Sequence, residues 1–272
     1  DDRIYAISQL MWMGVDPSRI CDITQIDMFF LDKIKNFIDA DIKLITFNFE
    51  AETFWTGDGQ YNYTALDNAL KFFYKNTCID ENGFNQEGFK TRLLVALTFC
   101  HGPNWWTRKY GSDTVNYARI DAATPSSDCI GNYSIHSFAS ERWIHDSTET
   151  VRKFVEYIEN SPYGKHVFGY RLGDGVYSEW CHFGMDTAMP DVSSSMVALF
   201  RNYLREKYGD DVAKLRAAWN MPRVTFENAL PPPPEVRLEY IGGSYRDPRN
   251  AWSIDFLECL MLSQKNLLLS MN

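Results

Sequence analysis

A short apolar run that ends in glycines, carboxylates and aromatic residues restricts the fold of this chain more than any other feature. The run extends from Val167 to Trp180 and contains Asp174 and Glu179. Such a sequence is typical of a buried strand that opens into a site, because the carboxyl ends of the parallel strands carry the chemistry of an α/β barrel. We therefore expect Asp174 and Glu179 to lie at the end of a strand, facing a site.

A strand followed by a helix is predicted four times along the chain. Short apolar runs predict the strands, and apolar residues at helical spacing predict the helices, with Thr64 and Asp146 as helix caps. Right-handed connections between parallel strands would then build an α/β fold. The predicted strands are 4–13, 42–50, 92–100 and one that starts at 167, and the predicted helices are 26–38, 65–75, 147–159, 192–208, 210–219 and 252–271.

Four such units correspond to half of a TIM (β/α)8-type barrel. A complete barrel typically takes about 250 residues, whereas four units with long insertions use most of the 272 residues of this chain. We therefore expect residues 1–272 to form the N-terminal part of a barrel domain, with insertions at about 101–145 and 209–250. The first insertion is expected to be a long loop, which usually serves a site. The alternative is an open α/β sheet in a complete protein.

The composition argues against several classes of function. The formal net charge is −9, so a nucleic acid would be repelled on average and is not an expected partner. No run approaches about 18 consecutive apolar residues, so we expect no membrane span. The six cysteines form no CxxC pair, and no P-loop, GxSxG or GxGxxG occurs, so we expect no metal and no cofactor. A secreted or periplasmic location is favoured over a cytoplasmic one.

Two adjacent tryptophans form a candidate sugar-binding surface. Trp105 and Trp106 follow His101 after the third predicted strand, and flat indole faces pack well against the C–H faces of sugar rings. Exposing both indoles is costly, so the alternatives are a bound ligand and packing at the rim of the barrel. Asn48 and Glu50 end the second predicted strand, where they either bind hydroxyl groups or cap the following turn.

Glu179 is the candidate catalytic acid. An acid that protonates a glycosidic oxygen has to be held on a rigid element and partly removed from water, which raises its pKa. Tyr177 and Trp180 flank Glu179 and provide such a setting. Together with Asp174 they are candidate substrate-binding residues. The alternatives are that Glu179 is a surface residue of a loop and that Asp174 is a turn residue.

Several motifs resemble the β-galactosidase-like proteins of glycoside hydrolase family 42 and their relatives. The resemblance rests on Gly169–Trp180, on FRNYLREKYG at 200–209, and on LRAAWN at 215–220 followed by Val-Thr-Phe at 224–226. Pro-Asn-Trp-Trp at 103–106 is also similar to the third-strand loop of that group, and a weaker likeness extends from residue 4 to the end. The resemblance implies a retaining (β/α)8 glycosidase that removes a terminal sugar, with a β-galactoside as the expected substrate.

One departure from the family pattern affects the expected acid. The family carries an Asn-Glu pair, with the Glu as acid/base, where this chain has Asp174-Gly175. Glu179 is therefore expected to act as the substitute acid. The family nucleophile is a Glu at the end of the seventh strand, so the resemblance implies that the remaining half of the barrel, from the same parent protein, is a necessary partner and that this fragment alone is inactive.

Two other functions stay open at this point. A non-catalytic carbohydrate-binding barrel that has lost the acid pair is favoured by Gly175. A metal-dependent barrel hydrolase would hold its ion between His101, Asp174 and Glu179. The scaffold alone does not choose among them, because this type of barrel supports many different chemistries.

Overall fold

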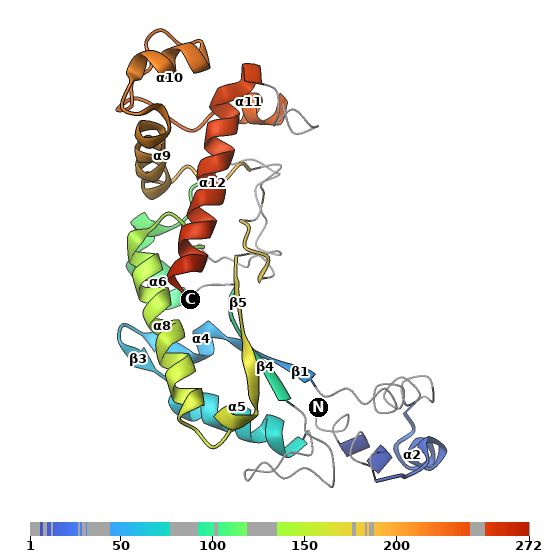
Figure 1. Ribbon diagram of the computed structural model, residues 1–272. Helices are drawn as coiled ribbons and strands as arrows, with labels where there is room; N and C mark the ends of the chain where they lie inside the picture. Colours follow the sequence, from blue (N-terminus) through green and yellow to red (C-terminus); the bar gives the residue numbers. More distant parts are fainter. Residues whose placement is uncertain are drawn as a thin grey trace. The chain divides into compact units, whose positions relative to one another are not determined.

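The structure is a computed structural model in which the chain forms two compact units (Figure 1). The first unit comprises residues 1–54, 61–98 and 154–172, and the second comprises 55–60, 99–153 and 173–272. The described residues are 6–7, 10–11, 13–26, 28, 31, 44–76, 92–100, 103–118, 135–175, 178–182, 184, 188–239 and 248–271.

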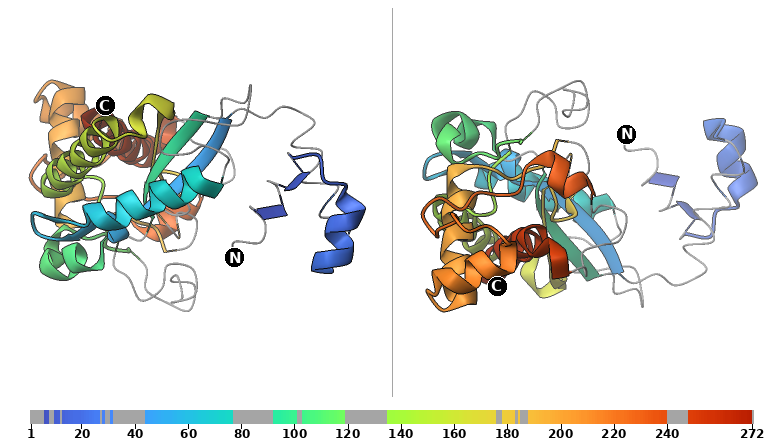
Figure 2. Two further views of the ribbon diagram at one scale, coloured as in Figure 1. Left: turned by 90° about the horizontal axis from the view of Figure 1, so that it is seen from below. Right: turned by 90° about the horizontal axis from the view of Figure 1, so that it is seen from above.

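The main sheet has three strands in the order β1-β4-β5. These are β1 (Leu44–Glu50), β4 (Arg92–Phe99) and β5 (Val167–Asp174), and they confirm three of the four predicted strands. Strands β1 and β4 are parallel, with Leu44 opposite Arg92 and Glu50 opposite Thr98. They lie side by side in both views of Figure 2. This register brings the carboxyl ends of the two strands to the same edge, as a barrel requires.

The strand predicted over residues 4–13 is wrong. Of the described residues of this segment, Ala6, Ile7, Leu10 and Met11 are helical, and Met13 lies in a turn. An apolar run of this length fits a buried helix as well as a buried strand, and the sequence pattern does not separate them. Helix α2 (Pro17–Thr24) follows, with a capping hydrogen bond from Ser18 N to Asp16. The segment has a small core of its own, formed by Ile7, Met11, Ile20 and Leu31.

Two helices begin earlier than the sequence predicts. Helix α5 (Tyr63–Asn76) is capped by Asn62, whose side-chain oxygen accepts a hydrogen bond from Ala65 N at 2.9 Å, so the prediction of Thr64 as the cap is wrong. Helix α8 (Glu141–Glu159) starts behind Ser140, whose hydroxyl accepts from Trp143 N at 3.1 Å. Asp146 is therefore not a cap. The remaining short elements around the sheet are α4 (Ala51–Phe54), β2 (Trp55–Gly57), β3 (Gln60–Tyr61) and η2 (Gly164–His166).

The segment 101–145 is more ordered than the long loop that the sequence predicts. It contains α6 (Asn104–Lys109), η1 (Gly111–Asp113), an antiparallel bridge between Thr114 and His136, and the first turn of α8. Residues 101–102 and 119–134 lie outside the described residues. The elements of this segment are too short for a periodic signal, and contacts distant in sequence stabilise them instead.

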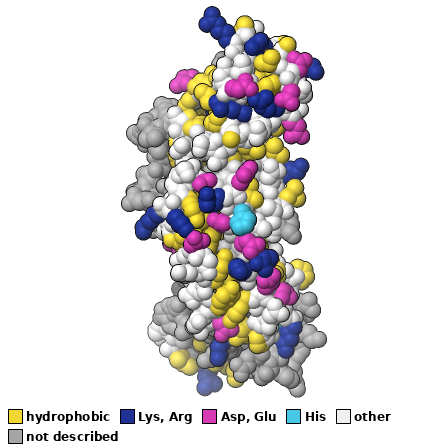
Figure 3. All heavy atoms as spheres, turned by 90° about the vertical axis from the view of Figure 1, so that its left-hand side faces the viewer, with side chains coloured by type: hydrophobic (Ala, Val, Ile, Leu, Met, Phe, Trp, Pro, Cys, Tyr) yellow, Lys and Arg dark blue, Asp and Glu magenta, His cyan; other side chains and the backbone are white. Residues whose placement is uncertain are grey.

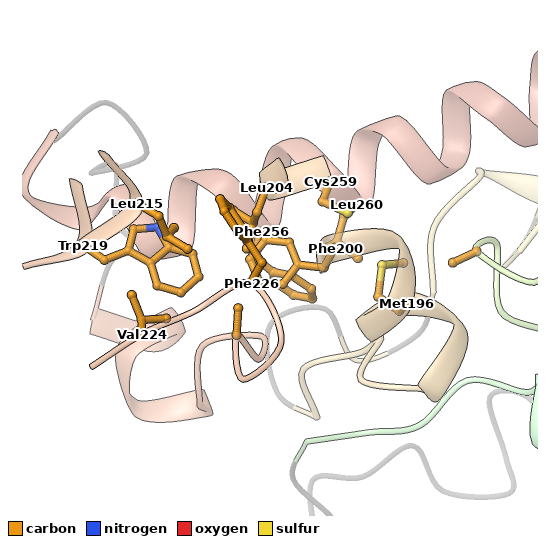
Figure 4. Close-up of a cluster of buried hydrophobic side chains, with 12 residues drawn as sticks. Met196, Phe200, Leu204, Leu215, Trp219, Val224, Phe226, Phe256, Cys259 and Leu260 are labelled. Carbon is orange, nitrogen blue, oxygen red and sulfur yellow. The ribbon is translucent and has the colours of Figure 1, made fainter. Parts of the chain in front are cut away.

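A helical cluster in the second unit has a continuous apolar core (Figure 4). Helix α9 (Ser194–Tyr208) begins behind the Ser193 cap and ends at Gly209, which has a φ of 63° and donates back to the last turn. Helix α10 (Val212–Trp219) begins behind the Asp211 cap. These helices and α12 (Ala251–Ser270) enclose Phe200, Leu215, Phe226 and Phe256 among other side chains. Along the chain, α11 (Pro234–Glu239) and η4 (Pro248–Asn250) come between α10 and α12.

A buried carboxylate ties the three long helices of this cluster together. Asp255 on α12 is 1% exposed and accepts hydrogen bonds from Lys207 Nζ at 2.7 Å, Tyr208 OH at 2.8 Å and Trp219 Nε1 at 2.7 Å. Burial lowers the pKa of Lys207, but its hydrogen bonds to Asp255 and Glu258 outweigh that effect and leave the pKa above its ordinary value. The ammonium is therefore held in its charged form beside Asp255.

Two surface properties follow from the described residues. Acidic and basic side chains are interspersed on the face that Figure 3 shows. In the part of the chain that the structure describes, no helix combines the length and apolar character that crossing a membrane requires.

Candidate functional site

Asp174, the last residue of β5, is the centre of a buried polar cluster in the second unit. Its side chain is 0% exposed. One carboxylate oxygen is 2.6 Å from His136 Nε2 and accepts from Gly175 N, also at 2.6 Å. The other oxygen accepts from Trp143 Nε1 at 3.3 Å. A buried carboxylate requires such partners, and with both oxygens occupied Asp174 acts here as an anchor for the chain around it.

Two glycines allow the chain after β5 to fold back on the strand end. A Cβ at Gly173 would lie 2.4 Å from Ser178 Cβ, and a Cβ at Gly175 would lie 2.3 Å from the carbonyl oxygen of Cys181. Gly175 also has a φ of 70°, a left-handed conformation that glycine adopts without a steric penalty. Trp180 N closes the loop by donating to the Asp174 carbonyl at 2.8 Å. The sequence Gly-Asp-Gly is therefore a requirement of this compact loop.

Glu179 lies near the tip of this loop and is exposed to solvent. Its neighbours Ser178 and Trp180 both have left-handed φ values, 64° and 58°. On the other side of the loop, the Cys100 thiol and the Ser178 hydroxyl are 2.8 Å apart. Burial, together with the nearby Glu179 carboxylate, raises the pKa of the Cys181 thiol. The described residues leave Glu179 open to water, so its role as the acid stays a prediction.

The two predicted platform tryptophans have different environments. Trp106 is fully buried, donates through Nε1 to Asp146 at 2.9 Å, and contacts Trp143 with ring centroids 4.9 Å apart. Trp105 is half-buried and donates through Nε1 to the carbonyl oxygen of Trp55 at 2.9 Å. Trp106 is therefore packed in the protein interior, and Trp105 retains a partly exposed ring that a ligand could contact.

A second buried layer lies behind the loop. His182 is 4% exposed and stacks on Phe138 with ring centroids 4.0 Å apart. Burial lowers the pKa of His182, although the charge of Asp191 acts in the opposite direction. Asp191 is fully buried and accepts from the Ser137 hydroxyl and from Ser193 N. The histidine is thus held uncharged close to a buried carboxylate.

The second unit brings together part of the predicted site. Asp174 and Trp180 share a hydrogen bond, and Asp174 and Trp106 both contact Trp143. The first unit holds Asn48 and Glu50, both exposed, at the end of β1. His101 and Tyr177 lie outside the described residues.

Three residues of the cluster escape prediction from the sequence. His136, Trp143 and His182 belong to no recognisable motif, and their spacing shows no helical or metal-binding pattern. Of the three, only His182 follows the Gly-Asp-Gly strand end closely enough in sequence to give a weak signal. Among the described residues, no three His, Cys, Asp or Glu side chains are placed to hold a metal ion.

Comparison with known proteins relates the chain to two different groups. Residues 1–56 match the family model described as "Carbamoyl-phosphate synthetase large chain, oligomerisation domain". This match concerns about a fifth of the chain and includes none of the residues around Asp174. No curated protein sequence matches the chain significantly.

The similar solved structures are glycosidase barrels. A β-galactosidase from the psychrophilic Marinomonas ef1 is 15% identical, with a TM-score of 0.53 over 85% of this chain and 35% of that one. A β-galactosidase from Rahnella sp. R3 is 12% identical, with a TM-score of 0.54 over 87% of this chain and 30% of that one. The β-amylase catalytic domain from Paenibacillus polymyxa is 14% identical, with a TM-score of 0.58 over 87% of this chain and 57% of that one.

These similarities establish the fold. The chain has the architecture of part of a TIM-type barrel, and it spans about a third of the two β-galactosidases and somewhat over half of the β-amylase domain. The prediction of a partial (β/α)8 barrel is confirmed, and the alternative of an open sheet is not supported.

Proposed function

We propose that the parent protein of this chain is a glycoside hydrolase in which Glu179 is the general acid and base. The observation that carries this proposal is the position of Glu179 on a compact loop that closes on the end of β5 through the hydrogen bond from Trp180 N to Asp174 O. Barrel enzymes place catalytic residues at this end of their strands. The similarity to barrel glycosidases supports the same reaction class by analogy.

The proposed reaction uses Glu179 twice. The protonated carboxyl group first gives its proton to the glycosidic oxygen as the sugar leaves. The resulting carboxylate then removes a proton from the water that releases the sugar from the enzyme. A second carboxylate about 5 Å away has to act as the nucleophile in this retaining route, and we assign it to the remaining half of the barrel. Substrate binding over Glu179 would remove the water that now surrounds its exposed side chain.

A terminal β-galactoside is the proposed substrate, and a carbohydrate is the proposed partner. The half-buried ring of Trp105 supports sugar binding in the second unit, because indole faces stack on sugar rings. Two of the similar structures are β-galactosidases and one is a β-amylase. Initial rates on nitrophenyl β-galactoside, nitrophenyl β-glucoside and starch would separate these substrate classes.

Leaving-group dependence of the Glu179→Gln variant tests the acid role in the full-length protein. Loss of a general acid slows substrates with a poor leaving group far more than those with an activated one, by about 10²- to 10⁴-fold. We expect this for kcat/KM on an alkyl β-galactoside, with a much smaller loss on dinitrophenyl β-galactoside. Glu206→Gln on α9, an exposed glutamate outside the cluster, is the matched control. Equal rates for Glu179→Gln and wild type on the alkyl substrate would remove Glu179 from the role.

Gly175 favours a second function, that of a non-catalytic carbohydrate-binding protein. The resemblance places the acid at this position, and the left-handed backbone and the contact with Cys181 leave no room for a side chain there. Calorimetric titration of the full-length protein with galactose and with a β-linked galactoside distinguishes the two functions. Binding with no release of sugar over days would support the binding protein.

A further inference from the structure

His136 and the residues next to it contact both ends of the loop that carries Glu179. The His136 imidazole meets Asp174, at the start of the loop, with 2.6 Å between Nε2 and Oδ1. Two residues along the chain, the Phe138 ring stacks on His182, at the far end of the loop, with centroids 4.0 Å apart. The segment 136–138 therefore holds the loop at Asp174 and at His182.

The backbone around His136 is itself anchored. His136 forms an antiparallel bridge with Thr114, and Ser137 N donates to Asp113 O at 2.9 Å. The imidazole of His136 stacks on Trp143, with centroids 3.5 Å apart and an angle of 13° between the rings. These contacts fix the place of the imidazole. Its hydrogen bond therefore holds Asp174 at a defined position relative to the backbone around His136.

The direction of the hydrogen bond follows from its partners. The Asp174 carboxylate accepts from Gly175 N and from Trp143 Nε1, so Nε2 of His136 is the donor in the third bond. His136 Nδ1 is buried and has no hydrogen-bond partner among the described residues. Removing the imidazole would therefore leave Asp174, which is 0% exposed, with one donor fewer.

The loop depends on such external contacts. Ser178 and Trp180, on either side of Glu179, adopt left-handed backbone conformations. Residues other than glycine adopt these conformations only at an energetic cost, and the conformations persist only where the surrounding structure imposes them. The contacts of His136 with Asp174 and of Phe138 with His182 belong to that surrounding structure.

We propose that His136 is a positioning residue that holds the 174–182 loop so that Glu179 is presented at the end of β5. The proposal rests on the proposed function, in which Glu179 is the acid and base. His136 does not contact the reacting atoms; it acts through Asp174 on the backbone that carries Glu179.

Two substitutions of His136 separate the hydrogen bond from the rest of the side chain. The amide nitrogen of His136→Gln reaches about as far as Nε2 and can donate to Asp174, whereas the shorter His136→Asn cannot. For the full-length protein on an alkyl β-galactoside, we expect His136→Asn to lower kcat by about 10- to 100-fold with KM within about twofold. His136→Gln is expected to recover most of the loss. A loss that is equal in both variants, or one confined to KM, would overturn the proposal.

The double variant shows whether His136 acts through Glu179. If it does, His136→Asn lowers kcat in wild type but changes it less than about threefold in the Glu179→Gln background, since coupled residues are not additive. Full additivity contradicts the proposal. An unchanged rate for Glu179→Gln alone would instead refute the proposed function.

Amide hydrogen exchange tests the positioning without any activity. We expect His136→Asn, but not His136→Gln, to speed exchange by at least about tenfold in the peptide that contains Ser178 and Trp180, while peptides from α10 keep their wild-type rates. Unchanged exchange in His136→Asn would overturn the proposal. If His136→Asn does not fold, Asp174→Asn carries the same test, because its amide nitrogen, a donor, replaces one of the two oxygens that accept from His136 and Trp143.

Discussion

Gly175 shows at the scale of one residue why this chain departs from the acid position of the family it resembles. Its φ of 70° and the 2.3 Å separation between a would-be Cβ and the Cys181 carbonyl oxygen exclude any side chain in this backbone. Under the proposed function, the acid therefore comes from another position of the loop. Glu179, at its exposed tip, is the carboxylate of the loop that solvent reaches.

We expect Gly175→Ala to lower the free energy of unfolding by about 3 kcal/mol or more. The left-handed conformation costs an alanine about 1–2 kcal/mol, and the contact with the Cys181 backbone adds to this because neither chain segment can yield without moving the loop. Gly209→Ala is the matched control, since Gly209 has a similar φ of 63° and nothing within 4 Å of its would-be Cβ. Urea unfolding of both variants should give a loss of only about 1 kcal/mol for Gly209→Ala. Equal losses would show that the loop is not as compact as described.

His182 predicts a dependence of stability on pH. Its pKa is lowered in the folded chain, mainly by burial, from an unfolded value near 6.5. Below pH 6.5 the unfolded chain therefore binds a proton that the folded chain does not, so this contribution to stability is complete above pH 6.5 and is lost as the pH falls. One proton corresponds to at most about 1.4 kcal/mol per pH unit.

The variant His182→Phe isolates this effect. It removes the titrating group and retains a ring on Phe138. We expect urea unfolding between pH 7 and pH 5 to show a smaller loss of stability in His182→Phe than in wild type. Identical slopes would mean that His182 carries its proton in the folded chain.

Residue-level reasoning from the sequence identified Glu179 and Asp174 but not the contacts around them. Gly, Asp and aromatic residues after an apolar run are a strong local signal, so the strand end was predictable. The partners of Asp174, His136 and Trp143, are more than 30 residues away along the chain. No local pattern encodes such contacts, so the anchoring role of Asp174 became clear only from the structure.

At the scale of helices and strands, prediction succeeded where caps and periodicity agree. Helix α9 has a Ser193 cap, an apolar stripe and a Gly209 stop, and its bounds differ from the predicted ones by at most two residues. Helix α8 was predicted too short because Asp146 looks like a cap. In the structure Asp146 lies within α8 and accepts a hydrogen bond from Trp106 Nε1 on α6. The first predicted strand failed because residues 4–13 are apolar without a clear period.

The three helices around Asp255 provide a test at this scale. Replacing Asp255 with Ala removes the acceptor of the half-buried Tyr208 hydroxyl and of the buried Trp219 indole, whereas Lys207, whose side chain is 31% exposed, retains Glu258. Each buried donor left without a partner costs about 1–3 kcal/mol. We expect this loss in urea unfolding. Glu258→Gln is the control, because Glu258 contacts Lys207 but is 48% exposed, and exposed pairs contribute about 0–1 kcal/mol. A small effect of Asp255→Ala would show that apolar packing alone holds α9, α10 and α12 together.

At the scale of the whole molecule, the chain supplies part of a barrel and, under the proposed function, part of its active site. The sheet described here has three strands, and β5 at its edge carries Phe168, which is 63% exposed. A barrel has no free edges, so the account requires further strands beside those described. The resemblance already predicted this from the sequence, whereas the division of the described residues into two units was not predicted.

The central claim is that Glu179 is one of two catalytic carboxylates, and the distance between them tests it most directly. The measurement is an experimental structure of the full-length protein with a β-galactoside bound. The account predicts the sugar against Glu179, and a second Asp or Glu from the remaining barrel with its carboxyl group about 5–5.5 Å from that of Glu179. A sugar bound elsewhere, or no carboxyl group within about 10 Å of Glu179, would contradict it.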